Sequence, residues 1–484
     1  MNRYLLYRVV GSLLFLEAFF MTWCLAVSLW YGESDTLAFV TGVVITASVG
    51  ALLRWEGREA KGGMTRKDAY LIVTVLWLVF SLFGSIPFIV GGYLPNITDA
   101  FFETMSGFTT TGATVINDVD SMPHGILFWR SLSQWIGGLG IVFFTIAVLP
   151  SMVGGSVRIF AAEATGPIRT KLHPRLSTTA KRIWSIYLLL TAACAVTFCI
   201  AGMNIFDGIN HAMTTTATGG FATHNDSIEF YNSPALEYAG AFFQFLSGIN
   251  FTLLYLTFFK GKFKGMFSNS ELKFYLLLVC SFTAVITVML IVNNHYNIEH
   301  AFRSSLFQVV SFITTTGLFS DDVAQWHHLS WVFLAILMFI GACAGSTSGG
   351  FKSIRALMVW KIIRNSFHQI LHPKAVLPVK INQHTITTTQ TNTLMAFFAV
   401  FVLACLFTST LMIAMGIDNT NAITISLSCI SNVGPTLGTQ IGPEMSWATL
   451  PDIVKWMCSL LMLIGRLEIF SVLLLFSRSF WKDN

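Results

Sequence analysis

Phe108-Thr109-Thr110-Thr111-Gly112 is the first of four related stretches that decide the fold of this chain. The other three stretches are Thr215-Thr216-Ala217-Thr218-Gly219, Ile313-Thr314-Thr315-Thr316-Gly317 and Ile430-Ser431-Asn432-Val433-Gly434. Their glycines are 107, 98 and 117 residues apart. A repeat of this length is a structural unit, so four copies predict four units around one axis.

Each stretch follows an apolar segment, such as 100–107 or 301–312, that is too short to span a bilayer. A short helix followed by hydroxyl residues and a glycine suits an ion filter, because glycine permits the backbone angles that turn carbonyl oxygens toward an ion. We therefore expect a potassium pore made by one chain. The carbonyls expected to contact K⁺ belong to Thr110, Thr111, Ala217, Thr218, Thr315, Thr316, Asn432 and Val433, and the expected filter glycines are Gly112, Gly219, Gly317 and Gly434.

The composition indicates an integral membrane protein. Of the 484 residues, 54% are hydrophobic and 11% are charged, and the mean hydropathy is +0.66. The apolar runs last about 20 residues, which predicts helices rather than a β-barrel. The eight cysteines form no CxxC pair, so we expect neither disulfides nor a zinc site.

Ten apolar segments predict an all-α fold with ten transmembrane helices and four re-entrant pore helices. The segments are 5–31, 36–53, 69–92, 126–152, 183–203, 236–259, 274–294, 330–366, 393–416 and 453–477. After an extra N-terminal hairpin, four helix–pore helix–helix repeats are expected to surround one pore. The boundaries are 1–66 for the hairpin, 67–175 for repeat 1 (filter 109–113), 176–268 for repeat 2 (filter 216–220), 269–375 for repeat 3 (filter 314–318) and 376–484 for repeat 4 (filter 431–435).

The charge distribution predicts the orientation. If the filters face outward, the inner loops and both termini hold 25 of the 29 lysines and arginines, which places both termini in the cytoplasm. Acidic residues follow three of the filters and would concentrate cations at the outer mouth, unless they are merely the polar residues that any outer loop needs. They are Asp118, Asp120, Asp226, Glu229, Asp321 and Asp322. The basic inner face suits anionic lipid or an acidic cytoplasmic partner, and nothing indicates nucleic acid.

The eighth apolar segment is interrupted by residues 341–350, which hold four glycines at membrane depth. Unwound backbone is tolerated there only if it is buried in protein or lines water. We expect this loop to be a gate; close helix packing through Gly341 and Gly345 is the alternative. The expected gate residues are Gly345, Ser346, Thr347, Ser348, Gly349 and Gly350.

The last apolar segment contains Arg466 and Glu468. Intramembrane charge is costly and usually faces a cavity or a partner. Arg466 below a cation filter would raise a barrier to the ion and belongs to the expected gate, and a structural ion pair is the alternative. We expect Glu468 to pair with another helix.

These residues also carry a resemblance to a known family. The stretches Ser106–Gly112, Trp129–Gly140, Gly345–Gly350, Ser431–Pro435 and Gly465-Arg466 resemble the Trk/Ktr-type bacterial potassium transporters, closest to the TrkH-like membrane subunits. The resemblance implies K⁺ uptake across the bacterial cytoplasmic membrane and a homodimer with one pore per subunit. It also implies gating by the intramembrane loop and control by a cytoplasmic nucleotide-binding subunit of the RCK/KTN (TrkA-like) type, with no organic cofactor in this chain. Ser348 departs from the glycine expected in the loop.

Three other functions compete with this one. A sodium-permeable relative is disfavoured because Gly112 is glycine, whereas serine at the first filter glycine accompanies sodium transport in plant relatives of this family. A membrane enzyme is disfavoured because the chain has no HExxH motif, serine–lysine pairing or carboxylate cluster. A secondary transporter with inverted repeats is disfavoured because the four copies share one orientation. Whether flux is channel-like or coupled to another ion stays open.

Overall fold

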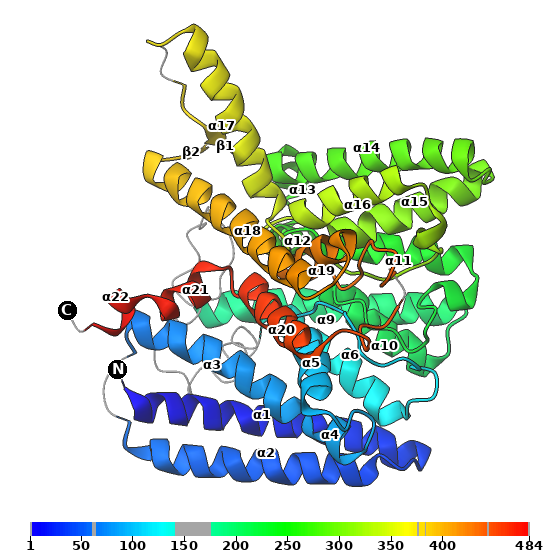
Figure 1. Cartoon of the computed structure of the whole chain (residues 1–484), viewed down its shortest axis with the longest axis vertical. Coiled ribbons are helices and arrows are strands. Elements are labelled where there is room, and N and C mark those ends of the chain that lie inside the picture. The colour runs from blue at the N-terminus through cyan, green and yellow to red at the C-terminus, as the bar shows by residue number, and fades with distance from the viewer. Residues whose placement is uncertain are drawn as a thin grey trace.

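The computed structural model describes residues 2–60, 64–140, 176–374, 377–382, 384–442 and 445–482, and it is almost entirely helical (Figure 1). The hairpin at the N-terminus is formed by α1 (Arg3–Tyr31) and α2 (Thr36–Glu56), followed by the 3-10 turn η1 (Gly57–Glu59). Both long helices lie side by side along α3 (Arg66–Gly84) in Figure 1. The predicted helical class is confirmed by this architecture.

Four units follow the hairpin, and each contains a long helix, a short helix that ends in one of the repeated stretches, and a second helix. The units are α3, α5 (Ile97–Phe108) and α6 (His124–Gly138); α9 (Leu176–Ile200), α10 (Ile205–Ala217) and α11 (Pro234–Ser247); α14 (Ser270–Asn293), α15 (Ile298–Ile313) and α16 (His328–Ile340); and α18 (Thr388–Ala414), α19 (Asn419–Ser431) and α20 (Asp452–Arg466). The short helices begin at side-chain caps where the chain offers them: Asn96, Asn204 and Asp418 accept hydrogen bonds from the first-turn amides of α5, α10 and α19.

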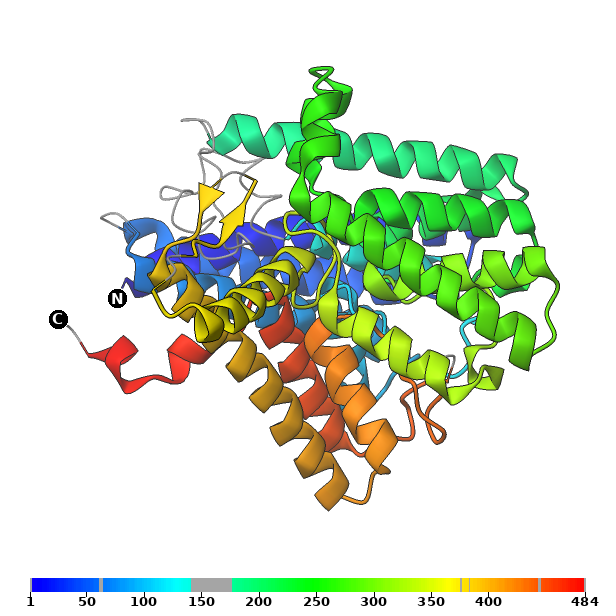
Figure 2. The ribbon, with the colours of Figure 1, turned by 90° about the horizontal axis from the view of Figure 1, so that it is seen from above.

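Smaller elements connect and extend these units. They are α4 (Ile86–Val90), η2 (Glu229–Tyr231), α12 (Phe251–Phe258), α13 (Phe263–Ser268), η3 (Val323–Gln325), α17 (Ser353–Leu371), α21 (Phe470–Leu473), η4 (Leu474–Phe476) and α22 (Arg478–Trp481). The sequence did not predict the two-stranded antiparallel hairpin of β1 (Lys380–Ile381) and β2 (His384–Thr385). Both chain termini lie at the same end of the molecule in two perpendicular views (Figures 1 and 2).

The predicted ten crossings are not all present as single long helices. Among the described residues, six helices are long and apolar enough to cross a membrane, namely α1, α2, α3, α9, α14 and α18. Counting each bent pair as one span raises the number to eight. The second half of the predicted crossing 126–152 lies outside the described residues.

Two crossings that the sequence presents as continuous are broken. α11 and α12 meet at 102°, because α11 ends at Ser247 and Asn250 caps a new helix with its side-chain oxygen. α20 and α21 meet at 110°, across Glu468 and Ile469, whose φ angles of 55° and 36° are incompatible with a right-handed helix. The break predicted after α16 is present, since Gly341 ends that helix with φ 70°.

The N-terminal hairpin depends on small residues between its helices. A Cβ on Gly11 would lie 2.7 Å from the backbone nitrogen of Arg54 and the backbone oxygen of Gly50. Gly57 approaches the backbone of Arg8 just as closely. The axes of α1 and α2 therefore come close only because these positions carry no side chain.

We expect Gly11→Leu to destabilise the protein by about 1–3 kcal/mol, since the added atoms meet backbone that cannot rotate away. The midpoint of thermal denaturation of the purified protein in detergent measures this loss. Val44→Leu, at a half-exposed position of the same hairpin, is the control and should leave the midpoint unchanged. Equal midpoints for the two variants would show that the glycine contact does not hold the hairpin.

Candidate functional site: a ring of four buried turns

All four short helices end in the same backbone turn. Its central residue has a left-handed conformation, with φ 55° at Thr110, 55° at Thr218, 57° at Thr315 and 55° at Asn432. The next amide donates back over five residues in each copy: Thr111 N to Ser106 O (2.9 Å), Gly219 N to Thr214 O (2.9 Å), Thr316 N to Ser311 O (2.8 Å) and Val433 N to Ser428 O (3.0 Å). This is the Schellman arrangement that ends a helix, usually with glycine at the left-handed position.

A glycine with positive φ stands two residues after each left-handed residue. These glycines are Gly112 (84°), Gly220 (84°), Gly317 (76°) and Gly434 (98°). The prediction of Gly219 as the filter glycine of the second copy is therefore one residue out of register. Both Gly219 and Gly220 follow the threonine, and the sequence could not tell which of them needs the positive φ. In the corrected register, Thr218 and Gly219 replace Ala217 and Thr218 as equivalents of Thr110 and Thr111.

The four turns close into a ring. A Cβ on each of the four glycines would overlap a backbone carbonyl oxygen of the next copy: Gly112 with Gly219, Gly220 with Thr316, Gly317 with Val433, and Gly434 with Thr111. The fourth contact leads back to the first copy, so the succession is cyclic. The central residues of all four turns are buried. Segments more than 300 residues apart in the chain thus meet backbone to backbone around one axis.

Side-chain hydroxyls brace two of the turns. Thr109 Oγ1 and Thr111 Oγ1 are 2.8 Å apart in the first copy, and Thr314 Oγ1 and Thr316 Oγ1 are 2.8 Å apart in the third. In the fourth copy Asn432 Nδ2 donates to Thr111 Oγ1 (3.1 Å), which ties the last turn to the first. The bracing is therefore local in two copies and shared between copies in the fourth.

The loop after α16 packs against three turns of the ring. Gly349 N donates to Thr315 Oγ1 (2.7 Å), Gly350 N donates to Ser431 O (2.9 Å), and Thr347 Oγ1 donates to Thr216 O (3.1 Å). A Cβ on Gly349 would overlap Ser431 O. Of the predicted gate residues, Thr347, Gly349 and Gly350 thus contact the repeated stretches of the second, third and fourth copies, whereas Gly345 lies against Asn250 and Ser346 bonds to Cys343 O.

The first half of this loop, around Ala344, is hydrogen-bonded to the second and third units. Glu271 Oε1 accepts from Ala344 N (2.6 Å), and Asn250 Nδ2 donates to Ala344 O (2.6 Å). Ser348, which departs from the expected glycine, accepts from Ala342 N through its hydroxyl (3.2 Å). Lys352, a non-glycine residue with φ 82°, donates from Nζ to Ser348 O. The unwound backbone is therefore hydrogen-bonded, as burial at membrane depth requires.

Arg466 joins the loop to the first unit. Its guanidinium donates to Thr347 O (3.0 Å), to Gly138 O (2.8 Å) and to Gly137 O. Glu468 pairs instead with Arg355 of α17 at 2.7 Å, which confirms the expectation that Glu468 meets another helix. Arg466 therefore links the loop after α16 to the end of α6.

A buried ion pair that the sequence does not predict lies behind the first turn. Arg130 Nε lies 2.9 Å from Glu103 Oε1, and their side chains are 2% and 0% exposed. Glu103 also accepts from Val115 N (2.9 Å), and Arg130 donates to Ala222 O of the second copy (3.0 Å). Arg130 could have signalled this pair in the sequence, because it is a charged residue in the apolar run after Pro123. Its partner Glu103, however, is 27 residues away on another helix.

Acidic residues gather after the second and third turns, as predicted. The pKa of Glu229 is raised by burial and then by the nearby charges of Asp321, Asp322 and Asp226. Ile228 N donates to Phe319 O (3.0 Å), so the loops after the second and third turns meet and their acidic residues share one negative field.

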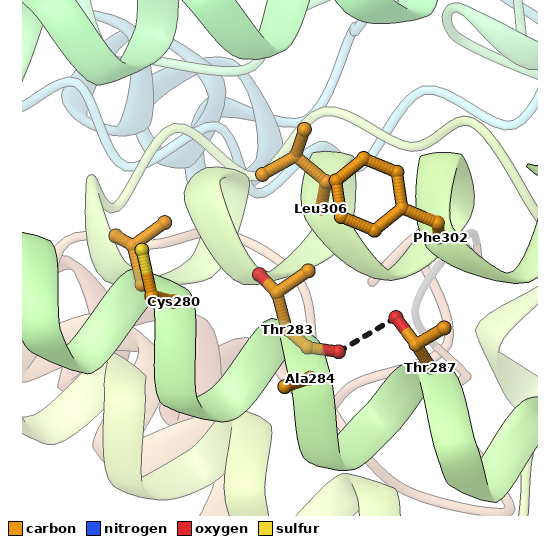
Figure 3. Close-up of a pocket in the computed structure, with 7 residues that line it drawn as sticks. Cys280, Thr283, Ala284, Thr287, Phe302 and Leu306 are labelled. Carbon is orange, nitrogen blue, oxygen red and sulfur yellow. Dashed lines mark hydrogen bonds between the residues drawn. The ribbon is translucent and has the colours of Figure 1, made fainter.

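A groove of about 410 Å³ lies between α14 and α15, away from the ring (Figure 3). It is lined by Val279, Cys280, Thr283, Ala284, Thr287, Phe302 and Leu306. Thr287 Oγ1 donates to Thr283 O (2.7 Å), so this hydroxyl is satisfied within its own helix. The seven lining residues are mostly apolar and do not form a cluster of oxygens that could bind an ion. The groove is therefore separate from the candidate site.

The chain contains helices of membrane-spanning length, and the turns of its four units form one ring. These features define a polytopic membrane protein built around a pseudo-fourfold axis. The chain belongs to the TrkH family, whose model is described as a cation transport protein and matches residues 36–483. This membership confirms the predicted family and makes the chain a membrane transport protein rather than an enzyme.

Relatives of known name match along the whole chain. The Trk system potassium uptake protein TrkH of Escherichia coli (strain K12) is 35% identical over 480 residues, covering 98% of this chain and 99% of that protein. The protein of the same name from Halomonas elongata is 34% identical over 484 residues and covers 100% of both chains. The crystal structure of the potassium transporter TrkH from Vibrio parahaemolyticus matches with a TM-score of 0.90 at 34% identity, covering 100% of each chain.

We expect Arg130→Met to cost about 3–5 kcal/mol, because it leaves the Glu103 carboxylate buried without its cation. The double variant Glu103→Gln/Arg130→Met should recover part of this loss, since no isolated charge remains. Yield of monodisperse protein and the denaturation midpoint in detergent measure both effects. A double variant less stable than Arg130→Met would show that the pair contributes more than the compensation of charge.

Proposed function

We propose that the chain takes up potassium across the bacterial cytoplasmic membrane, through the ring of four turns acting as a selectivity filter. The cyclic contact between each turn and the next carries this proposal, because only a closed ring can surround a dehydrated ion with oxygens from four sides. The full-length relatives named as potassium uptake proteins support K⁺ as the transported ion.

The K⁺ ligands in this proposal are backbone carbonyls of the left-handed residue and the residue after it. With the corrected register they belong to Thr110, Thr111, Thr218, Gly219, Thr315, Thr316, Asn432 and Val433, with Gly112, Gly220, Gly317 and Gly434 as the filter glycines. A sodium-permeable or ion-coupled cation transporter of the same fold is the alternative. Gly112 favours potassium over sodium.

The loop 341–350 and Arg466 form the proposed gate. The loop lies against the repeated stretches of three copies and Arg466 bridges it to α6, and these contacts support the proposal that both obstruct an ion leaving the ring. A cation several Å from the guanidinium meets a repulsion of about 2–4 kcal/mol at an effective dielectric constant near 20. Opening requires the loop to leave its hydrogen bonds and this charge to be displaced or offset.

The proposed membrane arrangement has the four short helices entering as re-entrant pore helices and the ten predicted crossings around them. The repeat boundaries remain 67–175, 176–268, 269–375 and 376–484, after the hairpin 1–66. Both termini would face the cytoplasm, because the basic residues concentrate in the loops on that side. Their common position at one end of the molecule supports the placing of both on the same side (Figures 1 and 2).

The proposed partners are a second copy of the chain, anionic lipid and a cytoplasmic nucleotide-binding subunit of the TrkA-like type. The relatives are named as parts of a Trk system, which supports a multi-component assembly. The basic inner loops supply a surface for an acidic partner or anionic headgroups.

We expect Gly112→Ser to admit sodium or abolish uptake, because any Cβ at this position overlaps Gly219 O and displaces a filter carbonyl. Rubidium and sodium flux into proteoliposomes measures the selectivity. Gly416→Ser is the matched control: Gly416 also has positive φ (92°), but a Cβ there would meet nothing within 4 Å. Wild-type selectivity in Gly112→Ser would remove the ring from the conduction path.

We expect Arg466→Ala to raise maximal rubidium flux by about one to three powers of ten without changing selectivity, because it removes the charge and the bridge to Thr347 O. Arg466→Lys keeps the charge but cannot reach three carbonyls with a planar fork, so it should give an intermediate flux. Flux is normalised to folded protein. Slower transport in both variants would leave Arg466 as part of the scaffold only.

A further inference from the structure

The second turn of the ring lacks the hydroxyl brace of the first and third. In those copies two threonines flank the left-handed residue and bond to each other at 2.8 Å. Ala217 and Gly219 stand at the equivalent positions of the second copy and offer no hydroxyl. This turn must therefore be held by something outside its own strand.

We propose that Gln134 of the first unit positions the second filter strand and thereby contributes to ion selectivity. This inference rests on the proposed function of the ring as a filter. Gln134 lies on α6 and is completely buried. Its Nε2 donates to Gly219 O (2.7 Å), and its Oε1 accepts from Phe221 N (3.1 Å). One carboxamide thus spans Gly220 and satisfies a backbone acceptor before this glycine and a backbone donor after it.

Gly219 supplies independent support for the brace. Its φ is not positive, so backbone conformation does not explain why this position is a glycine. A Cβ on Gly219 would overlap the carboxamide of Gln134. The two adjacent glycines therefore serve different purposes. Gly220 provides the positive φ that every copy requires, whereas Gly219 provides the space into which Gln134 inserts.

The brace acts on an oxygen that belongs to the ring. Gly219 O is the carbonyl that approaches Gly112 of the first copy, and it accepts only one hydrogen bond from Gln134. A carbonyl oxygen has two lone pairs, so the second remains available to an ion. Gln134 does not contact the ion in this arrangement and is a positioning residue: it fixes the direction of a carbonyl that would otherwise turn freely about Gly219-Gly220.

A second glutamine provides a matched control within the same chain. Gln244 lies on α11 in the related stretch Gln244-Phe-Leu-Ser-Gly248, which corresponds to Gln134-Trp-Ile-Gly-Gly138. Gln244 is also completely buried. Within the part of the chain that the structure describes, its side-chain carboxamide makes no hydrogen bond. The third turn, which Gln244 would serve by analogy, already has its threonine brace.

The first experiment compares Gln134→Met with Gln244→Met in the full-length protein reconstituted in liposomes. Methionine keeps the length and volume of glutamine but removes both polar atoms. We expect the ratio of rubidium to sodium flux to fall about tenfold in Gln134→Met and to change less than twofold in Gln244→Met. A tenfold change corresponds to about 1.4 kcal/mol, the order of one or two lost hydrogen bonds. An unchanged ratio in Gln134→Met, or an equal loss in both variants, would overturn the proposal.

The second experiment measures the coupling between Gln134 and Gly219 with a double-mutant cycle. Gly219→Ala alone should lower selectivity, because its methyl group pushes the carboxamide away. In the background of Gln134→Ala the same substitution should have no further effect on the ratio, since the space is then free. Additive effects would show that Gly219 is required for a reason unrelated to Gln134 and would contradict the proposed brace.

The outcomes separate this proposal from the proposed filter itself. If Gly112→Ser and Gly220→Ser change selectivity while Gln134→Met does not, the ring is the filter and only the brace is wrong. If none of the three changes it, the ring is not the filter and the proposal falls with it. Denaturation midpoints of all variants identify any change in flux that comes from unfolding, whereas a flux ratio does not depend on the amount of folded protein.

Discussion

The contact between a backbone carbonyl and the glycine of the next turn is the constraint on which the rest of the structure depends. It occurs at four places around one axis and leaves no room for a Cβ at any of them. Each unit must therefore bring a helix to an abrupt end and reverse the backbone within three residues. The left-handed residues at these ends are threonine or asparagine rather than glycine, at a cost of the order of 1 kcal/mol each. The hydrogen bonds that span each turn and the dense surroundings compensate for this strain.

The same crowding explains why the second helices are interrupted. α6 ends at Gly138, α11 at Ser247, α16 at Ile340 and α20 at Arg466. Gly137 and Gly465 lie against Phe108 O and Ile430 O of their own units, so the helices reach the turns only through small residues. The carbonyls released at the end of α6 accept from Arg466, and those of the loop after α16 are used by Asn250, Lys352 and Arg466. Irregular backbone at membrane depth is stable here because its polar groups have partners.

Pseudo-symmetry of the backbone does not require symmetry of the chemistry that supports it. Two turns use a pair of threonines, one uses an asparagine that reaches another copy, and one uses a glutamine from the neighbouring unit. Charged groups near the turns also differ between units: Glu103 and Arg130 lie behind the first turn, whereas Arg466 and Glu468 lie at the end of the fourth unit. A single chain can support each quarter of a ring differently, which four identical subunits cannot.

The sequence by itself determined the membrane location, the four units, the glycine of the first, third and fourth turns and the break at residues 341–350, because these depend on apolar length and on local backbone freedom. It did not determine the register of the second copy, since Gly219-Gly220 offers two glycines and only packing shows which provides φ and which provides space. It also presented 236–259 and 453–477 as continuous, because a capping asparagine or a strained Glu468-Ile469 does not lower the hydropathy of a segment. The partners of Arg130, Gln134 and Arg466 were decided by tertiary structure alone. Each lies on another helix, or in a loop or turn beyond it, and nothing in the local sequence states which helices will meet.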